Sequence, residues 1–255
     1  MIRGLYTACS GMMAQMVRQD VLANNLANAN TPGFKKDLAV TKAFPEILLK
    51  RLGEVDYKGS IPKAISPQTI GWMGTGVVID EVATNFESGN IVGTENPNDF
   101  ALTSEGYFCI ETPEGIRYTR NGAFKIDASG RLVTTDGYSV MGKNGYINPG
   151  DSIKTDGQGN ILLPDGTLEQ FKIVKFEDNK QLQKIGNNLF QAKEGEETLV
   201  DSTGLAQAYL ENSNVNAVVE MVELISAMRT YEMSQKVIQA EDQTLEMVAN
   251  QVGKL

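Results

Sequence analysis

The chain has 255 residues, of which 41% are hydrophobic, so it can bury a core as one large or two small domains. Its net charge is −9 and no basic cluster is interleaved with aromatic residues, which argues against a nucleic acid as partner. The absence of histidine removes His-based triads, the usual general base and most transition-metal sites. We therefore expect no enzyme, no cofactor, no metal site and no small-molecule substrate.

The first segment, about Ile2 to Asn28, has the pattern of a long amphipathic helix. Its apolar residues recur in steps of four and three, the spacing of a coiled-coil seam. The motif Asn30-Thr31-Pro32-Gly33 ends the helix, because proline disfavours helical backbone in the residue before it. The predicted seam consists of Leu5, Cys9, Met12, Met16, Gln19, Ala23 and Leu26.

Two cysteines lie a hundred residues apart, Cys9 in this seam and Cys109 in an apolar run with strand character. In such surroundings cysteine behaves as a small hydrophobic residue. We therefore expect two buried free thiols rather than a disulfide, and their spacing does not match a zinc site.

Residues 36–76 follow as a segment rich in glycine and proline, and we expect an extended arm. Within it, Ala43 to Leu52 could form a short amphipathic helix interrupted by Pro45. The single tryptophan, Trp72, could anchor the arm on a neighbour. We expect it instead to pack on the domain that follows.

From residue 77 to 209 the apolar pattern changes to period two, with frequent turns. Strands are predicted at 100–102, 107–110, 116–119 and 123–126. The pairs Asp136-Gly137, Asp156-Gly157 and Asp165-Gly166 are strong hairpin signals, because glycine supplies the positive φ of primed turns. The pattern predicts an antiparallel β domain, of sandwich or barrel-like form.

Residues 210–255 predict a second long helix, from about Val215 to Leu255, that Asn214 or Asn216 can cap. It is longer than a domain of this size needs, and Val218, Val222 and Ile225 add a second apolar line at its start. Residues 1–36 carry a net charge of +3 and residues 215–255 a net charge of −3, which favours their pairing. The predicted seam consists of Met221, Leu224, Met228, Tyr231, Gln235, Ile238, Asp242, Leu245, Ala249 and Val252.

The predicted fold class is α+β: two long terminal helices that pair as a coiled coil, with an inserted, mainly antiparallel β domain. The boundaries are 1–35, 36–76, 77–209 and 210–255. The simpler alternative is that both helices are core helices of an ordinary globular domain. No apolar run is long enough to span a bilayer, and polar residues interrupt the start, so we expect no cleaved signal peptide.

Several segments are more specific than these patterns. The run Asn24 to Lys35 resembles the N-terminal signature of the bacterial flagellar rod and hook proteins, and Leu210 to Asn216 with the helix after it resembles their C-terminal signature. Between them, the segments 99–102, 106–108 and 118–124 are similar to the central β domain of that family. These matches occur in the family's order along the chain.

The resemblance implies a structural subunit of the flagellar basal-body rod, proximal or distal, that forms the axial drive shaft between motor and hook. Its partners would be copies of itself, other rod and hook subunits, and the flagellar export apparatus.

The competing interpretation is a secreted or surface β-domain adhesin, oligomerised by a coiled-coil stalk. A charge at Leu224 or Leu26 should block assembly and leave the β domain folded. The expected assembly interface consists of Leu5, Cys9, Met12, Met16, Asn25, Leu26, Asn28, Pro32, Gly33, Phe34, Met221, Leu224, Met228, Tyr231, Ile238 and Leu245.

Overall fold

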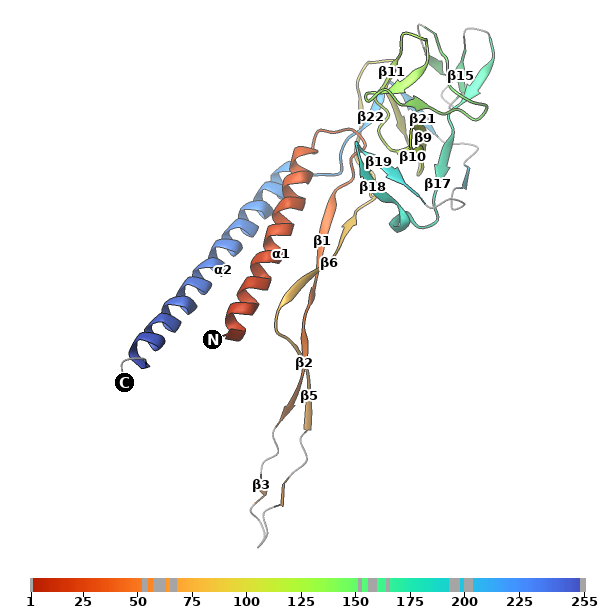
Figure 1. Cartoon of the computed structure of the whole chain (residues 1–255). Helices are drawn as coiled ribbons and strands as arrows, with labels where there is room; N and C mark the ends of the chain where they lie inside the picture. The colour runs from red at the N-terminus through yellow and green to blue at the C-terminus, as the bar shows by residue number, and fades with distance from the viewer. Residues whose placement is uncertain are drawn as a thin grey trace. The chain divides into compact units, whose positions relative to one another are not determined.

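The computed structural model describes residues 2–51, 55–56, 63–64, 68–150, 153–155, 160–163, 166–192, 198–199 and 204–252. The chain divides into two compact units (Figure 1). Unit 1 contains residues 1–23, 38–83 and 219–255, and unit 2 contains residues 24–37 and 84–218. Both long helices and the arm therefore belong mainly to unit 1, and the β domain belongs to unit 2.

Within the described residues, unit 1 has two helices and three pairs of strands. They are α1 (Ile2–Ala27), β1 (Asp37–Ala43), β2 (Glu46–Arg51), β3 (Val55–Asp56), β4 (Lys63–Ala64), β5 (Gln68–Gly74), β6 (Val77–Thr84) and α2 (Ala217–Val252).

The elements of unit 2 are short strands and one 3₁₀ turn. They are β7 (Ile91–Gly93), β8 (Phe100–Leu102), β9 (Tyr107–Thr112), β10 (Gly115–Thr119), β11 (Phe124–Ile126), β12 (Leu132–Thr134), β13 (Ser139–Val140), β14 (Lys154–Thr155), β15 (Asn160–Leu162), β16 (Leu168–Gln170), β17 (Ile173–Lys175), η1 (Asn179–Gln181), β18 (Gln183–Gly186), β19 (Leu189–Gln191), β20 (Thr198–Leu199), β21 (Leu205–Gln207) and β22 (Tyr209–Glu211).

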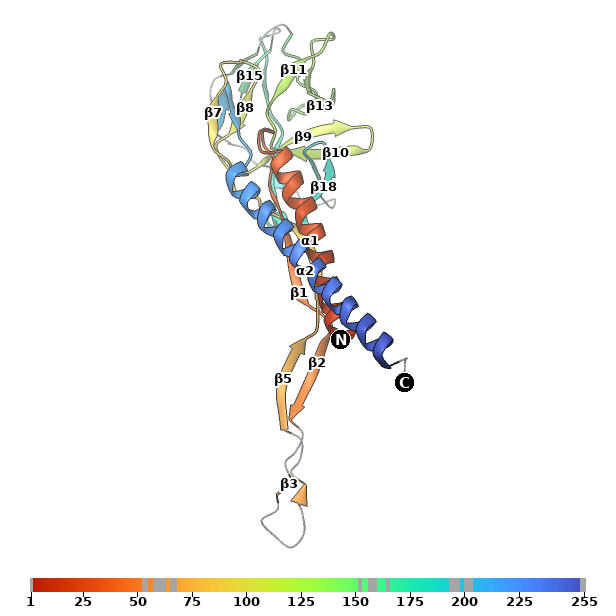
Figure 2. The same ribbon diagram turned by 90° about the vertical axis from the view of Figure 1, so that its left-hand side faces the viewer.

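The two helices lie side by side and run antiparallel, as Figures 1 and 2 show. Arg18 of α1 pairs with Glu223 of α2 at 3.1 Å, and a Cβ atom built on Gly4 would lie 2.8 Å from the Glu241 carboxylate. At the start of α2, Asn216 Oδ1 accepts a hydrogen bond from the backbone N–H of Val218, which confirms the predicted cap. α1 has 26 residues and α2 has 36, so the two helices differ in length.

The arm is a β-hairpin, and the helix predicted between Ala43 and Leu52 is wrong. Strand β2 pairs with β5 over its whole length, with Leu48 opposite Trp72 and Ile47 opposite Met73. Pro45 has no N–H group and would remove a hydrogen bond from a helix. In the hairpin, β2 and β5 satisfy each other's backbone groups, so the strand pair is favoured. Trp72 is 68% exposed, so the expectation that it packs on the β domain is wrong as well.

The β domain of unit 2 is built on a nine-stranded antiparallel sheet. Its central strand, β9, places Phe108 in one apolar core and Tyr107 and Cys109 in another, because alternate side chains of a strand point to opposite faces. The antiparallel β domain and its four predicted strands are confirmed. The first core contains Phe100, Leu102, Phe108, Phe124, Leu132, Val140, Ile147, Ile153, Ile161, Phe171, Ile173 and Leu205.

Of the predicted hairpin turns, Asp136-Gly137 joins β12 to β13. Gly137 has a φ of +87° and its N–H donates to Thr134 O at 3.0 Å. Asp156-Gly157 and Asp165 lie outside the described residues. In the described parts of the chain, neither helix is apolar over a stretch that could cross a bilayer.

Candidate functional site

Segments far apart in the sequence meet around the carboxylate of Glu211 in unit 2. Lys35 donates to Glu211 Oε1 at 2.5 Å, and Arg120 Nε donates to Glu211 Oε2 at 2.5 Å. The backbone N–H of Gly89 also donates to Oε1, at 2.9 Å. We call Lys35, Arg120 and Glu211 the signature junction, because each lies in one of the segments that carry the resemblance.

The charges of the signature junction are buried. Lys35 and Glu211 are each 2% exposed and Arg120 is 6% exposed. Their remaining donors reach backbone carbonyls: Lys35 Nζ donates to Glu87 O, and the Arg120 guanidinium to Gly106 O and Leu102 O. Buried charges are stable only when paired and hydrogen-bonded, so this junction ties β8, β22 and the turn after α1 into one unit.

The turn after α1 fits this junction through Gly33. Its φ is +69°, and its N–H donates to Glu211 O at 2.7 Å. A Cβ atom at this position would lie 2.5 Å from the backbone of Arg120 and Asn121. Pro32 O accepts a hydrogen bond from Asn188 Nδ2 at 2.8 Å. Glycine is therefore required both by the backbone conformation and by the close approach.

Phe34 is buried beside Lys184, whose Nζ lies 4.3 Å from the centre of its ring, a cation–π distance. The same ammonium donates to Lys35 O and to Asp37 Oδ1. Phe34 thus anchors the signature turn against strand β18.

Asparagine side chains hold the neighbouring backbone. Asn25 is buried, and its amide donates to Asp37 O at 2.8 Å and accepts from Asp37 N at 2.9 Å. Asn28 Nδ2 donates to Asn24 O, which caps the end of α1. Asn214 accepts from Lys36 N and donates to Asn85 O. Asn25 and Asn28 therefore hold the end of α1 and the start of β1 within the same chain.

The electrostatics of the junction favour its ionised state. Burial alone would raise the pKa of Glu211, but Arg120 and Lys35 outweigh this effect and hold its pKa below the ordinary value of 4.5. Burial lowers the pKa of Lys35 below 10.5, although Glu211 acts in the opposite direction. Because the pKa of Glu211 is depressed on folding, it stabilises the folded chain above the ordinary carboxyl range.

We expect the free energy of unfolding to fall as the pH decreases below 4.5. In that range the unfolded chain binds a proton at Glu211 before the folded chain does, so acid favours unfolding. Urea unfolding between pH 7 and pH 3 measures this slope. The variant Glu211→Gln should show a shallower fall than the wild type, and an identical slope in both would contradict the assignment.

In unit 1, a set of buried or half-buried residues recurs in steps of three and four along each helix. These inner lines are Leu5, Ala8, Met12, Gln15, Gln19 and Leu22 in α1, and Leu224, Ala227, Tyr231, Ser234, Ile238, Glu241 and Leu245 in α2. α1 has a further such set, which includes Ser10, Ala14 and Val17 of the groove described below. In both helices, alternate members of the predicted seam lie on the inner line. At the other seam positions, the inner line contains the preceding residue instead of the predicted one, and that residue is often small or polar.

The replaced seam residues are exposed. Cys9 and Met16 of α1 and Met228 of α2 project from the helices, so the expectation of a buried Cys9 thiol is wrong, whereas Cys109 is buried. Ala227 is buried on the inner line of α2, whereas the neighbouring seam residue Met228 is exposed. An apolar stripe remains exposed at the start of α2: Met221, Val222, Ile225 and Met228.

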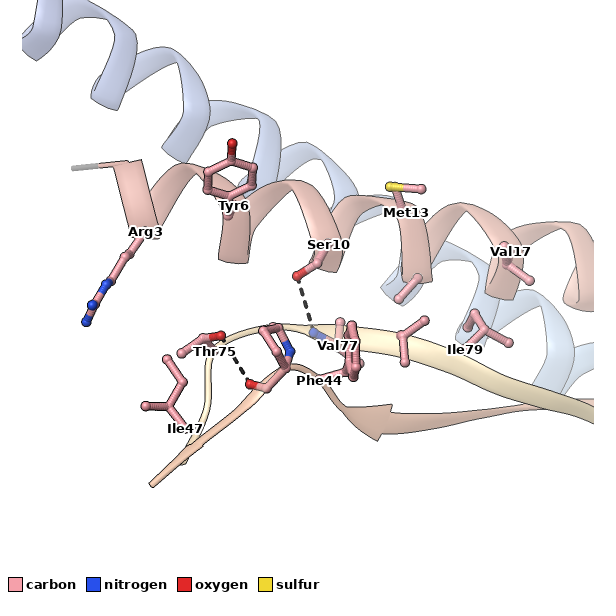
Figure 3. Close-up of a pocket in the computed structure, with 14 residues that line it drawn as sticks. Arg3, Tyr6, Ser10, Met13, Val17, Phe44, Ile47, Thr75, Val77 and Ile79 are labelled. Carbon is pink, nitrogen blue, oxygen red and sulfur yellow. Dashed lines mark hydrogen bonds between the residues drawn. The ribbon is translucent and has the colours of Figure 1, made fainter. Parts of the chain in front are cut away.

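Unit 1 also contains a groove of about 580 Å³ between α1 and the strands (Figure 3). Ser10 Oγ accepts a hydrogen bond from Val77 N at 3.2 Å on one side, and Thr75 Oγ1 donates to Pro45 O on the other. The lining is mainly apolar: Arg3, Tyr6, Ser10, Met13, Ala14, Val17, Phe44, Pro45, Ile47, Thr75, Gly76, Val77, Val78 and Ile79.

Known proteins resemble this chain over its whole length. The flagellar basal-body rod protein FlgG of Borreliella burgdorferi is 35% identical over 98% of both chains. The FlgG protein of Bacillus subtilis is 32% identical over 98% of this chain and 99% of its own. The flagellar hook-basal body complex protein FlhO of the same organism is 32% identical over 100% of both. The chain belongs to the flagellar basal-body rod protein family.

Family descriptions match three parts of this rod-family chain. "Flagella basal body rod protein" matches residues 5–35, "Flagellar hook protein FlgE/F/G D1 domain" matches 101–177, and "Flagellar basal body rod FlgEFG protein C-terminal" matches 206–252. The family is structural, so the protein is not an enzyme, and it belongs to the flagellar basal body. An adhesin is not supported. The described residues contain no cluster of metal-binding side chains.

The structure separates the predicted site residues of this rod protein into three groups. Asn25, Asn28, Pro32, Gly33 and Phe34, with the half-buried Leu26, lie near the junction in unit 2. Leu5, Met12, Leu224, Tyr231, Ile238 and Leu245 lie on the inner lines, and Cys9, Met16, Met221 and Met228 are exposed. Sequence reasoning missed the roles of Arg120, Lys184 and Glu211. Charged residues inside otherwise polar or apolar motifs were the signal that could have revealed them.

Proposed function

We propose that this chain is a structural subunit that assembles through its terminal helices, paired as a coiled coil, into the rod between motor and hook. The observation that carries the proposal is the pattern on α2. A half-buried inner line runs along α2, and a separate apolar stripe, Met221, Val222, Ile225 and Met228, remains exposed. Exposed apolar patches of this kind mark interaction surfaces.

Two features support a coiled coil between α1 and α2. The inner lines keep the alternation of three and four residues that coiled coils require. The pair Arg18–Glu223 joins the helices at the edge of this line, in the position where charged pairs set register. The long α2 helix would then present the exposed stripe to neighbouring subunits, and contacts that do not close on themselves build a helical assembly.

The partners that this proposal implies are copies of the same chain and other axial subunits of rod and hook. We also propose that the chain passes through the flagellar export apparatus without a cleaved signal peptide. The family resemblance supports this route, and intact mass spectrometry of the chain in isolated basal bodies tests it.

The variant Met228→Glu is expected to abolish incorporation into the rod while it leaves the free chain folded. Met228 is 48% exposed, so a carboxylate there is hydrated in the monomer, and we expect its free energy of unfolding to change by less than about 0.5 kcal/mol. In an assembled subunit the same carboxylate would be buried without a partner. Immunoblots of isolated basal bodies and urea unfolding of the purified chain measure the two quantities.

Gln243→Glu is the matched control, because it adds the same charge at an exposed position of α2 about four turns beyond the stripe. This control should still enter the rod. Normal incorporation of Met228→Glu would refute the role of the stripe, as would loss of the folded monomer in that variant.

A further inference from the structure

Trp72 is the only tryptophan of the chain, and it is 68% exposed on strand β5. Its neighbour Ile70 is equally exposed, and Leu48, opposite Trp72 on β2, is 37% exposed. An indole ring is large, rigid and mostly apolar, and tryptophan is enriched among residues that dominate binding energy at interfaces. An exposed tryptophan on a regular strand therefore indicates an anchor for a partner surface.

The groove along α1 has the size and lining for such an anchor. Its volume of about 580 Å³ lies within the range of pockets that enclose small organic ligands. Ala14, Val17 and Ile79 supply apolar walls, and the aromatic rings of Tyr6 and Phe44 stand at its rim, 70% and 59% exposed (Figure 3). Aromatic pairs gain energy beyond the burial of their area, so these rims favour an aromatic occupant.

One cation lies at the end of this groove. Arg3 lines it, and its guanidinium has no ion-pair or hydrogen-bond partner within the part of the chain that the structure describes (Figure 3). A guanidinium is attracted to the negative face of an aromatic ring, and tryptophan is the best such partner. The Arg3 guanidinium therefore favours an indole ring as occupant, because an aliphatic side chain has no aromatic face to attract it.

The indole that fills the groove cannot come from the same strand pair in its present register. Ile47 lines the groove and lies opposite Met73, whereas Trp72 is the next residue and lies opposite Leu48. Successive side chains of a strand point to opposite faces, so Trp72 faces away from the groove that Ile47 borders. A second copy of the chain has no such restriction.

We propose that Trp72 of one copy inserts into the groove of a second copy, between Tyr6, Phe44 and Arg3. The β2–β5 hairpin is then a connector that links successive subunits by a contact separate from the helical stripe. This inference rests on the proposed self-assembly, because it requires a second copy in contact.

The single tryptophan makes the proposal measurable by fluorescence of the full-length chain. On assembly, the emission of Trp72 should shift to shorter wavelength, and its quenching by acrylamide should fall several-fold. The double variant Arg3→Ala/Tyr6→Ala should leave Trp72 as quenchable as in the dilute monomer. Asp20→Ala, an exposed position of α1 outside the groove, is the matched control and should behave as the wild type.

A mixing experiment identifies the occupant. Trp72→Ala keeps the groove but has no tryptophan, and Arg3→Ala/Tyr6→Ala keeps the tryptophan but has a defective groove. Mixing the two under assembly conditions should protect the remaining indole, which shows that it enters the groove of the other chain. Protection already present in dilute wild-type chain, and lost in the groove variant, would mean docking within one chain and would overturn the proposal.

Sedimentation of the same samples separates the two proposals. If the wild type assembles and Trp72 stays as quenchable as in the monomer, the tryptophan contact is wrong and the rod function stands. If the chain assembles neither alone nor with the axial proteins of isolated basal bodies, both are wrong.

Discussion

Replacing Glu211 by glutamine is expected to lower the free energy of unfolding of unit 2 by about 3–5 kcal/mol. Lys35 and Arg120 both donate to this carboxylate and are almost fully buried. Glutamine keeps one oxygen that can accept a hydrogen bond, but it has no negative charge, so two uncompensated cations remain in a medium of low polarity. The cost therefore comes from the uncompensated cations rather than from lost attraction alone.

Urea unfolding, with hydrogen exchange of amides in β9 and β10 as the probe of unit 2, measures this loss. Asp127→Asn is the control, because Asp127 of unit 2 also pairs with an arginine, Arg131, but both side chains are about half exposed. An exposed pair contributes at most about 1 kcal/mol. Equal losses in the two variants would show that burial does not give Glu211 its importance.

Gly33→Ala is expected to cost about 2–4 kcal/mol, from two sources that act together. A residue with a side chain pays about 1–2 kcal/mol in the left-handed region that the φ of +69° requires. Its Cβ atom would also lie 2.5 Å from the backbone of Arg120, so one of the two segments must shift. The variant therefore combines backbone strain at residue 33 with a disturbed arrangement of the signature junction.

Gly137→Ala separates these two sources. Gly137 has a similar φ of +87°, but its added Cβ atom would meet no atom within 4 Å. We expect it to lose only the conformational part, about 1–2 kcal/mol. Thermal unfolding of both variants measures the two losses, and the extra loss in Gly33→Ala gives the cost of the close Cβ contact. Equal losses would argue against that contact.

These variants also distinguish folding from assembly. Substitutions at Glu211 and Gly33 should weaken the free chain before any partner is present. Met228→Glu should leave the free chain intact and act only on incorporation. The signature motifs and the exposed stripe would thus serve different steps of the same structural role.

Local patterns in the sequence were sufficient for the two long helices and for the four strands predicted in the β domain. The helical period of α1 and α2 spans many turns, and strands such as 107–110 alternate clearly, so short-range spacing identifies them. The proline-glycine motif ended α1 within one residue of its predicted end. The antiparallel class of the β domain also followed, because its turn signals and strand lengths are local features.

Long-range contacts decided the rest. Residues 46–51 became a strand because β5 offered a partner, which overrode a weak helical pattern. Which of two adjacent helix residues is buried, for example Ala227 or Met228, depends on the element packed against the helix, since one step along a helix rotates a side chain by about 100°. Glu211, Arg120 and Lys35 are separated by many residues in sequence, and only the folded backbone brings their charges within 2.5 Å. Local sequence determined the long helices and the predicted strands of the β domain. Tertiary packing determined the strands of the arm and which faces and charges meet, because pairing and burial depend on partners that local spacing does not specify.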